Sequence, residues 1–305
     1  MTRQATGHRQ PVTVFAPGSV GNVGPGFDIL GLAIDGIGDR VTVDLEKSGP
    51  VVVRGVDASL VPTDPAKNAA AIAARAMAKR DVHLTIDKGI PVSAGLGGSA
   101  SSSVAGAFAA ALACGIDASP NAVMLAALEG EIAVSGRHLD NIAPITLGGL
   151  VLSRCIDPID VIALRAPKHW SIALITPNVR IETKKARAIL PQQWDRESWT
   201  QQMANTTALV VAFLTADAAL VRRALDDRYA EPRRSPMIPH FDDVKRAALD
   251  AGAFGCSISG SGPTIFAICE DANAEKCAES MRKAMGKVQS VVRVATIAHE
   301  GARPV

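Results

Sequence analysis

The sequence has few aromatic residues and almost no net charge. Aromatic side chains make up 4% of its 305 residues, and 32 lysines and arginines are balanced by 30 aspartates and glutamates. Proteins that bind nucleic acid or membrane surfaces usually carry a basic face or aromatic stacking platforms. We therefore expect neither partner, and the composition favours small-molecule chemistry.

Cysteines and long apolar runs are also scarce. The five cysteines form no CxxC pair and are odd in number, which argues against a disulfide framework or a zinc site, so we expect core thiols in a reducing cytosol. The N-terminal MTRQATGHRQ has no apolar core of the signal-peptide kind, and the run at Val104–Cys114 is too short to span a bilayer. We expect a cytoplasmic protein that is neither exported nor inserted into a membrane.

The chain does contain enough apolar material for a large core. With 48% hydrophobic residues over 305 positions, it is expected to be globular and to form two domains. Strand-type alternation dominates the first sixty residues, and a second unit opens after Pro167 and ends in the order helix, strand, turn, strand, helix, strand. The joint near Leu164–His169 gives two α+β domains, 1–166 and 167–305.

The expected strands are Val12–Ala16, Arg40–Glu46, Val51–Arg54, Val82–Asp87, Gly149–Ser153, Val161–Arg165, Ser171–Thr176, Ala253–Ser257, Thr264–Ile268 and Ser290–Ala298. The expected helices are Pro65–Arg80, Ser99–Cys114, Asn121–Val134, Glu182–Leu190, Ser198–Leu214, Asp217–Asp227, Phe241–Ala251 and Ala272–Met285.

The segment Pro91–Ala100, PVSAGLGGSA, is a glycine-rich loop between an expected strand and an expected helix. Its three glycines let backbone N–H groups converge on a bulky anion at a helix N-terminus, and the serines after them add hydroxyl donors or a magnesium ligand. These residues are Gly95, Gly97, Gly98, Ser99, Ser101 and Ser102. A plain tight connection is the alternative. The pattern favours the phosphates of a nucleoside triphosphate.

The loop belongs to neither of the two common phosphate-binding motifs. A Walker A element needs a Lys directly after its second Gly, and no Lys lies in this turn. The spacing GLGGSA also lacks the GxGxxG pattern of dinucleotide-binding folds. A third class of phosphate loop is indicated.

Four further segments carry polar side chains, none of which would by itself indicate a functional site. They are SVGNVGPGFDILGLAI, with Asn22 and Asp28; GEIAVSGRHLDNIAP, with Glu131 and an exposed-looking turn at His138, Asp140 and Asn141; the arginines Arg187, Arg233 and Arg234; and SISGSGPTIFAI, a strand, glycine turn and strand. Taken singly, such residues more often form Asx turns, lie in solvated loops or face water.

In combination, these segments resemble the homoserine kinases, a family of the GHMP small-molecule kinase superfamily. PVSAGLGGSA is similar to PxxxGLGSSA, NVGPGFDILGLAI to NLGPGFDxLGxAL, RHLDNIAPITLGG to HxDNVAPxxxGG, and ISGSGPTIFAI to SGAGPTxFAL. The resemblance covers about Val12 to Ile297. It implies ATP-dependent phosphorylation of the side-chain hydroxyl of L-homoserine to O-phospho-L-homoserine, on the route to threonine. It also implies a GHMP fold, with an N-terminal ribosomal-protein-like βαβ domain and a C-terminal ferredoxin-like domain, and a homodimer.

The resemblance also assigns site residues. Asn22 and Asp28 would hold the substrate ammonium, Arg187 and Arg234 its carboxylate, and His138 and Asn141 would aim the hydroxyl at the γ-phosphate; Ser99 and Glu131 would hold Mg²⁺. The ATP site would comprise Asn68, Pro91, Ala94, Gly95, Leu96, Gly97, Gly98, Ser99, Ala100 and Ser101. The expected catalytic residues are Ser99, Glu131, His138 and Asn141.

Three positions depart from related patterns. Gly98 replaces the first serine of GLGSSA, Arg233 stands where EPYR has tyrosine, and Ser19 of APGS stands where mevalonate-type relatives have lysine. We expect Arg234, rather than Arg233, to face the substrate. Since no clear general base is present and Asp140 looks structural, we expect catalysis by alignment and metal-supported charge stabilisation. The alternatives are a GHMP kinase for another small alcohol and a non-catalytic nucleotide-binding protein of the same fold.

Overall fold

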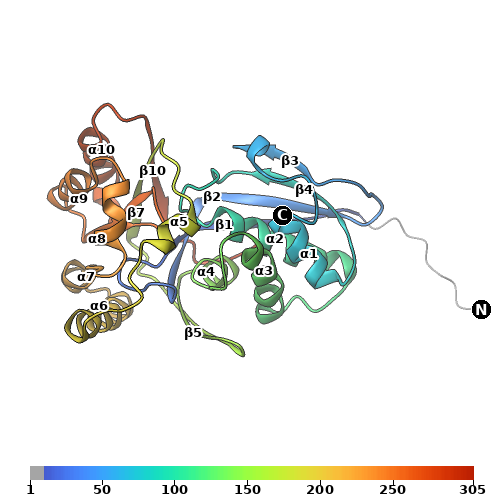
Figure 1. The fold of residues 1–305 in the computed structure, drawn as a ribbon, viewed down its shortest axis with the longest axis horizontal. Coiled ribbons are helices and arrows are strands. Elements are labelled where there is room, and N and C mark those ends of the chain that lie inside the picture. Colours follow the sequence, from blue (N-terminus) through green and yellow to red (C-terminus); the bar gives the residue numbers. More distant parts are fainter. Residues whose placement is uncertain (1–9) are drawn as a thin grey trace, which may run out of the picture.

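The computed structural model describes residues 10–305, which form two halves, each built on one β-sheet with helices (Figure 1). The N-terminal stretch that lacks a signal-type apolar core lies almost entirely outside these residues. No helix within 10–305 is long and apolar enough to cross a membrane.

The first half holds a seven-stranded sheet with the strand order β11-β1-β2-β4-β3, to which β5 adds beside β2 and β6 beside β5. All pairs are antiparallel except β3 with β4. The strands are β1 (Val12–Gly21), β2 (Leu30–Asp44), β3 (Val52–Gly55), β4 (His83–Lys88), β5 (Leu150–Ile156), β6 (Ile159–Leu164) and β11 (Arg303–Pro304).

Small residues allow the helices of this half to pack closely. The helices are α1 (Ala69–Ala78), α2 (Gly98–Cys114), α3 (Pro120–Val134) and α4 (Ile142–Leu147). α2 packs on β1 and β2, and α1 and α3 pack against α2. A Cβ at Gly106 would lie 2.7 Å from the carbonyl oxygen of Ala70, so glycine is needed where α2 meets α1.

The second half holds a four-stranded antiparallel sheet in the order β10-β7-β9-β8. Its strands are β7 (Trp170–Pro177), β8 (Gly255–Ile258), β9 (Ile265–Glu270) and β10 (Ser290–Thr296). Its helices are α5 (Thr183–Ala188), α6 (Arg196–Thr215), α7 (Ala218–Ala224), α8 (Glu231–Arg234), α9 (Phe241–Asp250) and α10 (Ala274–Ala284).

Alternate residues of β7 enter two different hydrophobic cores. Ala173 and Ile175 pack with α9 and α10, whereas Ile172 and Leu174 pack with residues of α6, α7, β1 and β2. This follows from the two-residue period of a strand, which points successive side chains to opposite faces. The second of these cores is therefore shared by both halves of the molecule.

The end of the described chain returns from the second half to the first. After β10, Ala298 donates its N–H to the carbonyl of Ala33 at 3.0 Å, and β11 then pairs with β1. Figure 1 accordingly shows the C-terminus beside the helices of the first half.

The structure confirms the predicted α+β architecture and the predicted element order at the end of the second half. The first ten residues of β2 were not predicted as a strand. Leu30–Ile34 is buried on both faces, so the polar–apolar alternation that marks a half-exposed strand is missing there.

The prediction that all five cysteines are core thiols is wrong for two of them. Cys256, Cys269 and Cys277 are buried, but Cys155 is exposed near the end of β5 and Cys114 is half-buried at the end of α2. All five are free thiols, and burial raises the pKa of the Cys269 thiol to about 12.

Candidate active site

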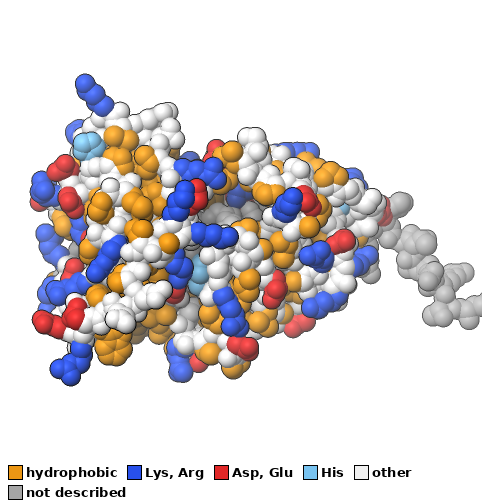
Figure 2. Space-filling view, viewed as in Figure 1, with side chains coloured by type: hydrophobic (Ala, Val, Ile, Leu, Met, Phe, Trp, Pro, Cys, Tyr) orange, Lys and Arg blue, Asp and Glu red, His pale blue; other side chains and the backbone are white. Residues whose placement is uncertain are grey.

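A cavity of about 490 Å³ lies between the two halves. Figure 2 shows the hollow from outside, with lysine and arginine side chains around its rim. Its lining comes from the glycine-rich loop, the ends of α1 and α3, the turn before α4, α5 and the turn between β8 and β9.

The glycine-rich loop forms one wall of this cavity. Gly95 and Gly97 have φ values of 77° and 68°, in the left-handed region that favours glycine. A Cβ at Gly97 would lie 2.2 Å from Oγ of Ser19, and one at Gly95 would lie 2.6 Å from the carbonyl oxygen of Ser259. The loop thus brings the N-terminus of the 17-residue helix α2 to the cavity, which is a favourable place for an anion.

Most of the loop residues predicted to bind ATP line the cavity: Pro91, Ala94, Gly95, Gly97, Gly98 and Ser99. Leu96, Ala100 and Ser101 do not, and they are at most 2% exposed. The Ser101 hydroxyl instead donates to the carbonyl of Ala16 at 2.8 Å, and its backbone N–H donates to the carbonyl of Gly97. The predicted contacts of these three residues with ATP therefore have no support from their positions.

A buried ion pair behind the loop escaped the sequence analysis. Lys88 pairs with Asp39 and donates to the carbonyl of Gly98 at 3.0 Å and to Oγ of Ser102 at 3.1 Å. Asp39 also accepts from Ser102 and from the backbone of Gly89 and Ile90. The pair fixes the first turn of α2 to β4. Lys88 directly follows the predicted strand Val82–Asp87, but nothing near it in the sequence indicates its distant partner Asp39.

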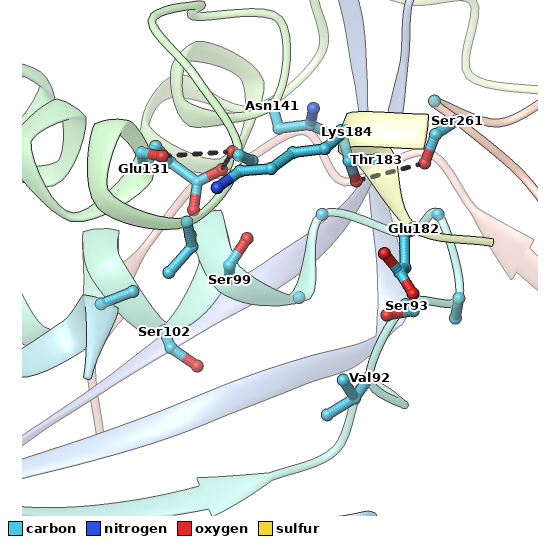
Figure 3. Close-up of a pocket in the computed structure, with 18 of the residues that line it drawn as sticks. Val92, Ser93, Ser99, Ser102, Glu131, Asn141, Glu182, Thr183, Lys184 and Ser261 are labelled. Carbon is cyan, nitrogen blue, oxygen red and sulfur yellow. Dashed lines mark hydrogen bonds between the residues drawn. The ribbon is translucent and has the colours of Figure 1, made fainter. Parts of the chain in front are cut away.

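Glu131 of α3 presents a free carboxylate oxygen near the loop. The residue is 3% exposed; its Oε2 accepts from Oγ of Ser135 at 2.6 Å, while Oε1 is buried with no hydrogen-bond partner among residues 10–305. Burial raises the pKa of Glu131, although the hydroxyls of Ser135 and Ser99 oppose this shift. Figure 3 shows Ser99 and Glu131 on the same side of the cavity. A carboxylate and a hydroxyl are hard oxygen ligands that fit Mg²⁺.

The turn with His138 and Asp140 is buried, so the prediction of an exposed turn is wrong. His138 is 8% exposed and Asp140 3%. The turn packs against β2 because Gly31 has no side chain: a Cβ there would lie 1.7 Å from the carbonyl oxygen of Asp140. Sequence alone did not reveal this long-range contact.

His138 lies beside a carboxylate that favours its charged form. Its Nδ1 lies 2.8 Å from Oδ1 of Asp140, as an ion pair without good hydrogen-bond alignment. Burial disfavours the charged imidazolium, but the adjacent Asp140 carboxylate outweighs burial and raises the pKa of His138 to about 9. Asp28 and Glu131 contribute further negative charge in the same direction.

Asn141 is oriented by Ser19. The Ser19 hydroxyl, which is fully buried on β1, donates to Oδ1 of Asn141 at 2.8 Å. The Asn141 amide is thereby fixed at the cavity wall beside Gly97 of the glycine-rich loop. Ser19 occupies the position where mevalonate-type sequences have lysine, and the sequence analysis gave it no role.

Asp28 and Arg187 form a bidentate ion pair inside the cavity, with both N–O distances at 2.7 Å. Asp28 has a left-handed φ of 61° and donates its backbone N–H to Oδ1 of Asn22 at 2.9 Å. Nδ2 of Asn22 donates to the carbonyl of Gly260 at 3.1 Å. Asn22 therefore orients Asp28 through its backbone.

Arg234, and not Arg233, reaches the cavity. Arg234 is 3% exposed and donates to the carbonyls of Ala186 at 3.1 Å and Gly260 at 2.9 Å, and burial lowers its pKa. Arg233 donates instead to the carbonyls of Arg228 and Tyr229. Arg234 thus lines the cavity and Arg233 does not, while the binding of substrate by Arg234 stays a prediction.

Asn68 lies in the cavity wall, but its amide is occupied by the protein. Oδ1 accepts from the N–H of Ala71 at 3.1 Å, which caps α1, and Nδ2 donates to the carbonyl of Pro62 at 2.7 Å. Lys184 and Thr183 of α5 also line the cavity, and the Thr183 hydroxyl lies 3.4 Å from that of Ser261 (Figure 3). The sequence analysis assigned neither of these two residues.

Comparison with models of known protein families shows to which class of protein the chain belongs. The family model for the GHMP kinases N terminal domain matches residues 65–149, and that for the GHMP kinases C terminal matches 209–287. The first of these spans includes the glycine-rich loop, Glu131 and Asn141. Fold and site together thus define a kinase of the GHMP class, which uses ATP and acts on a small molecule, and the predicted GHMP fold is confirmed.

Relatives that match nearly the whole chain show which family within this class it belongs to. Homoserine kinase of Chloroherpeton thalassium is 40% identical over 96% of this chain and 98% of its own length, and that of Arabidopsis thaliana is 41% identical over 96% and 84%. The crystal structure of homoserine kinase from Cytophaga hutchinsonii is 38% identical with a TM-score of 0.90, covering all of both chains. The chain belongs to the homoserine kinase family.

Proposed function

We propose that this protein transfers the γ-phosphoryl group of ATP to the side-chain hydroxyl of L-homoserine, giving O-phospho-L-homoserine. The observation that carries this proposal is that a single cavity has two walls of different chemistry. One wall is a glycine-rich anion site beside Glu131, and the other holds Asp28, Arg187 and Arg234. Homoserine is a zwitterion with a primary alcohol, so it matches the second wall while its hydroxyl extends toward the first.

On the donor side, the N–H groups of the glycine-rich loop would bind the phosphates, with Pro91, Ala94, Gly95, Gly97 and Gly98 lining the site. Ser99 and Glu131 would hold Mg²⁺, which supplies positive charge for the phosphate oxygens. The free Oε1 of Glu131 supports this assignment. Asn68 would contribute to the nucleotide site as part of its wall.

On the acceptor side, Asp28 would bind the ammonium group, and Arg187 and Arg234 the carboxylate. Charge-assisted hydrogen bonds contribute roughly 1.5–3 kcal/mol each, so this set can decide substrate identity. Asn22 would act mainly by orienting Asp28. His138 and Asn141 would aim the hydroxyl oxygen at the γ-phosphate, since both side chains line the cavity beside the loop.

We propose that the transfer proceeds without a dedicated general base. At neutral pH His138 is protonated, since its pKa is about 9, so it does not accept the proton of the substrate hydroxyl as a general base would. Phosphoryl transfer has a loose transition state and depends mainly on positioning and charge stabilisation, so the hydroxyl proton can leave late, to an oxygen of the transferred phosphoryl group, while the β-phosphate oxygen leaves with ADP. A protonated His138 can supply a hydrogen bond and positive charge to the reacting oxygens.

ADP release with a panel of acceptors tests the proposed function. With ATP and Mg²⁺, the protein should release ADP rapidly with L-homoserine and at least about 100-fold more slowly with galactose, which has neither charged group, or with mevalonate, which has a carboxylate but no ammonium for Asp28. Faster turnover of another alcohol would favour a GHMP kinase of different specificity. ATP binding without turnover on any acceptor would favour a non-catalytic nucleotide-binding protein.

Three broader properties belong to the same proposal. The domains would be 1–166 and 167–305, supported by the two separate sheets. The protein would be a cytoplasmic homodimer: family membership supports the dimer, and the five free thiols support a reducing compartment. Light scattering should then give twice the chain mass of 31.7 kDa.

A further inference from the structure

We propose that the ion pair between Asp28 and Arg187 selects for zwitterionic ligands, because a ligand must separate the pair in order to bind either partner. This inference deepens the proposed function and rests on it. Both groups that would recognise the two charges of the substrate are directed at each other in this structure, through two N–O contacts of 2.7 Å.

The pair links the two halves of the molecule across the cavity. Asp28 comes from the loop between β1 and β2, and Arg187 comes from α5. Their side chains are 32% and 40% exposed and line the cavity, so a ligand can reach both. The Arg187 guanidinium also lies 5.2 Å from the centre of the Phe27 ring, which holds it over the site.

Within residues 10–305, neither Asp28 nor Arg187 has a second ion-pair partner within 4.0 Å. The ion pairs of Asp28 within 4.0 Å involve Arg187 alone. Arg234 also lies over Phe27, 5.4 Å from the ring centre, and is held by the carbonyls of Ala186 and Gly260. When the pair opens, Asp28 and Arg187 therefore each need a new partner.

This requirement distinguishes ligands by charge. A zwitterion supplies an ammonium to Asp28 and a carboxylate to Arg187, so both protein charges are paired again. A ligand with only a carboxylate leaves Asp28 unpaired, and one with only an ammonium leaves Arg187 unpaired. Opening the pair breaks two charge-assisted hydrogen bonds, and a singly charged ligand replaces them on one side only, which leaves the other partner to water. The pair thus penalises each singly charged ligand.

The test is titration calorimetry on the full-length protein with three ligands: L-homoserine, 4-hydroxybutyrate, which lacks the ammonium, and 2-aminobutane-1,4-diol, which lacks the carboxylate. In the wild type, L-homoserine should bind most tightly. Asp28→Asn should tighten 4-hydroxybutyrate binding about tenfold, and Arg187→Gln should tighten aminobutanediol binding about tenfold, because the freed partner no longer has to be separated. L-homoserine should bind more weakly to both variants.

Two features keep this test decisive. Asn tolerates the left-handed conformation that Asp28 adopts, so Asp28→Asn preserves the loop, and Arg187→Lys offers a second variant that keeps the charge but loses the bidentate contact. The matched control is Arg233→Gln, outside the cavity, which should change none of the three affinities.

The possible failures are distinguishable. If L-homoserine binds the wild type but neither singly charged ligand gains affinity in its variant, the selection by the pair is refuted and the proposed function stands. If the wild-type protein binds no L-homoserine, the proposed function and the inference fall together.

Discussion

At the level of single residues, buried charges set the properties of the cavity. Glu131, His138 and Asp140 are each less than 9% exposed, and Asp140 is the main group that raises the pKa of His138 against the effect of burial. Asn22, Ser19 and Asn68 use their polar groups to orient neighbours. The chemistry of the site thus depends on a layer of side chains that only the folded structure assembles.

His138 should make the protein less stable as the pH rises from 6.5 to 9. Its pKa is about 9 in the folded protein and 6.5 in the unfolded chain, so its stabilising contribution is complete below pH 6.5 and is lost as the pH passes 9. The difference corresponds to roughly 3 kcal/mol. Urea unfolding of wild type and His138→Gln over this range measures it. Parallel pH curves for the two proteins would contradict the assignment.

Arg234→Lys should raise the KM for homoserine at least tenfold and leave the KM for ATP nearly unchanged, because lysine cannot reproduce the planar, bidentate contact with a carboxylate. Arg233→Lys is the matched control, since Arg233 contacts only the carbonyls of Arg228 and Tyr229 among its hydrogen-bond partners in residues 10–305. Steady-state kinetics after a melting check measures both. Equal changes in the two KM values would remove Arg234 from the substrate site.

The identities of the charged residues at the site could be predicted from the sequence motifs, but their contacts could not. Asp28, Arg187 and Arg234 come from three distant segments, and nothing local shows that two of them pair while the third is held by backbone carbonyls. The burial of the turn with His138 and Asp140 was missed for the same reason. This turn packs against β2 at Gly31, where a side chain would collide with the carbonyl of Asp140.

Among the elements, the glycine-rich loop with α2 determines the donor side. Its position was predicted to within one residue, since the glycines, the small-residue helix and the preceding alternating strand are all local signals. The inward turn of Ser101 was not predicted, because the choice among the serines depends on which face of α2 packs against β1.

Gly97→Ala should disable this element. The residue has a φ of 68°, and an added Cβ would lie 2.2 Å from Oγ of Ser19 and 3.0 Å from Oδ1 of Asn141. We expect ATP affinity and kcat each to fall at least tenfold, with a loss of about 1–3 kcal/mol in the free energy of unfolding. Nucleotide titration, kinetics and urea unfolding measure these effects.

Gly98→Ser is the control for this change. Its φ is not in the left-handed region, and the atoms nearest to an added Cβ would be side-chain atoms of Ile90, at 3.2 Å, and Lys88. It restores the serine of GLGSSA and should retain most activity. Comparable losses in Gly97→Ala and Gly98→Ser would show that backbone conformation at Gly97 is not the determining feature.

Across the whole molecule, a shared core and a returning chain join the two halves. The core between β7 and the β1–β2 pair contains residues from both sheets, and β11 closes the first sheet beside β1. The order of domains could be predicted from sequence. The return of the chain could not, because a two-residue strand carries no periodic signal.

Removing residues 303–305 should destabilise the first half although these residues follow the second. The deletion removes the pairing of Arg303 and Pro304 with β1 and the 3.0 Å hydrogen bond from Val305 N–H to the carbonyl of Thr13. We expect a loss of roughly 1–3 kcal/mol in the free energy of unfolding. Urea unfolding of the shortened chain measures it, and an unchanged midpoint would show that β11 contributes no stability.

The proposed reaction transfers the γ-phosphoryl group of ATP to the side-chain oxygen of homoserine. The most direct measurement is ³¹P NMR of the products formed from ATP, Mg²⁺ and L-homoserine by the full-length protein. The expected products are ADP and a single phosphomonoester whose phosphorus couples to the two protons of the adjacent methylene group. Inorganic phosphate as the only product besides ADP, or a phosphate on the carboxylate, would contradict it.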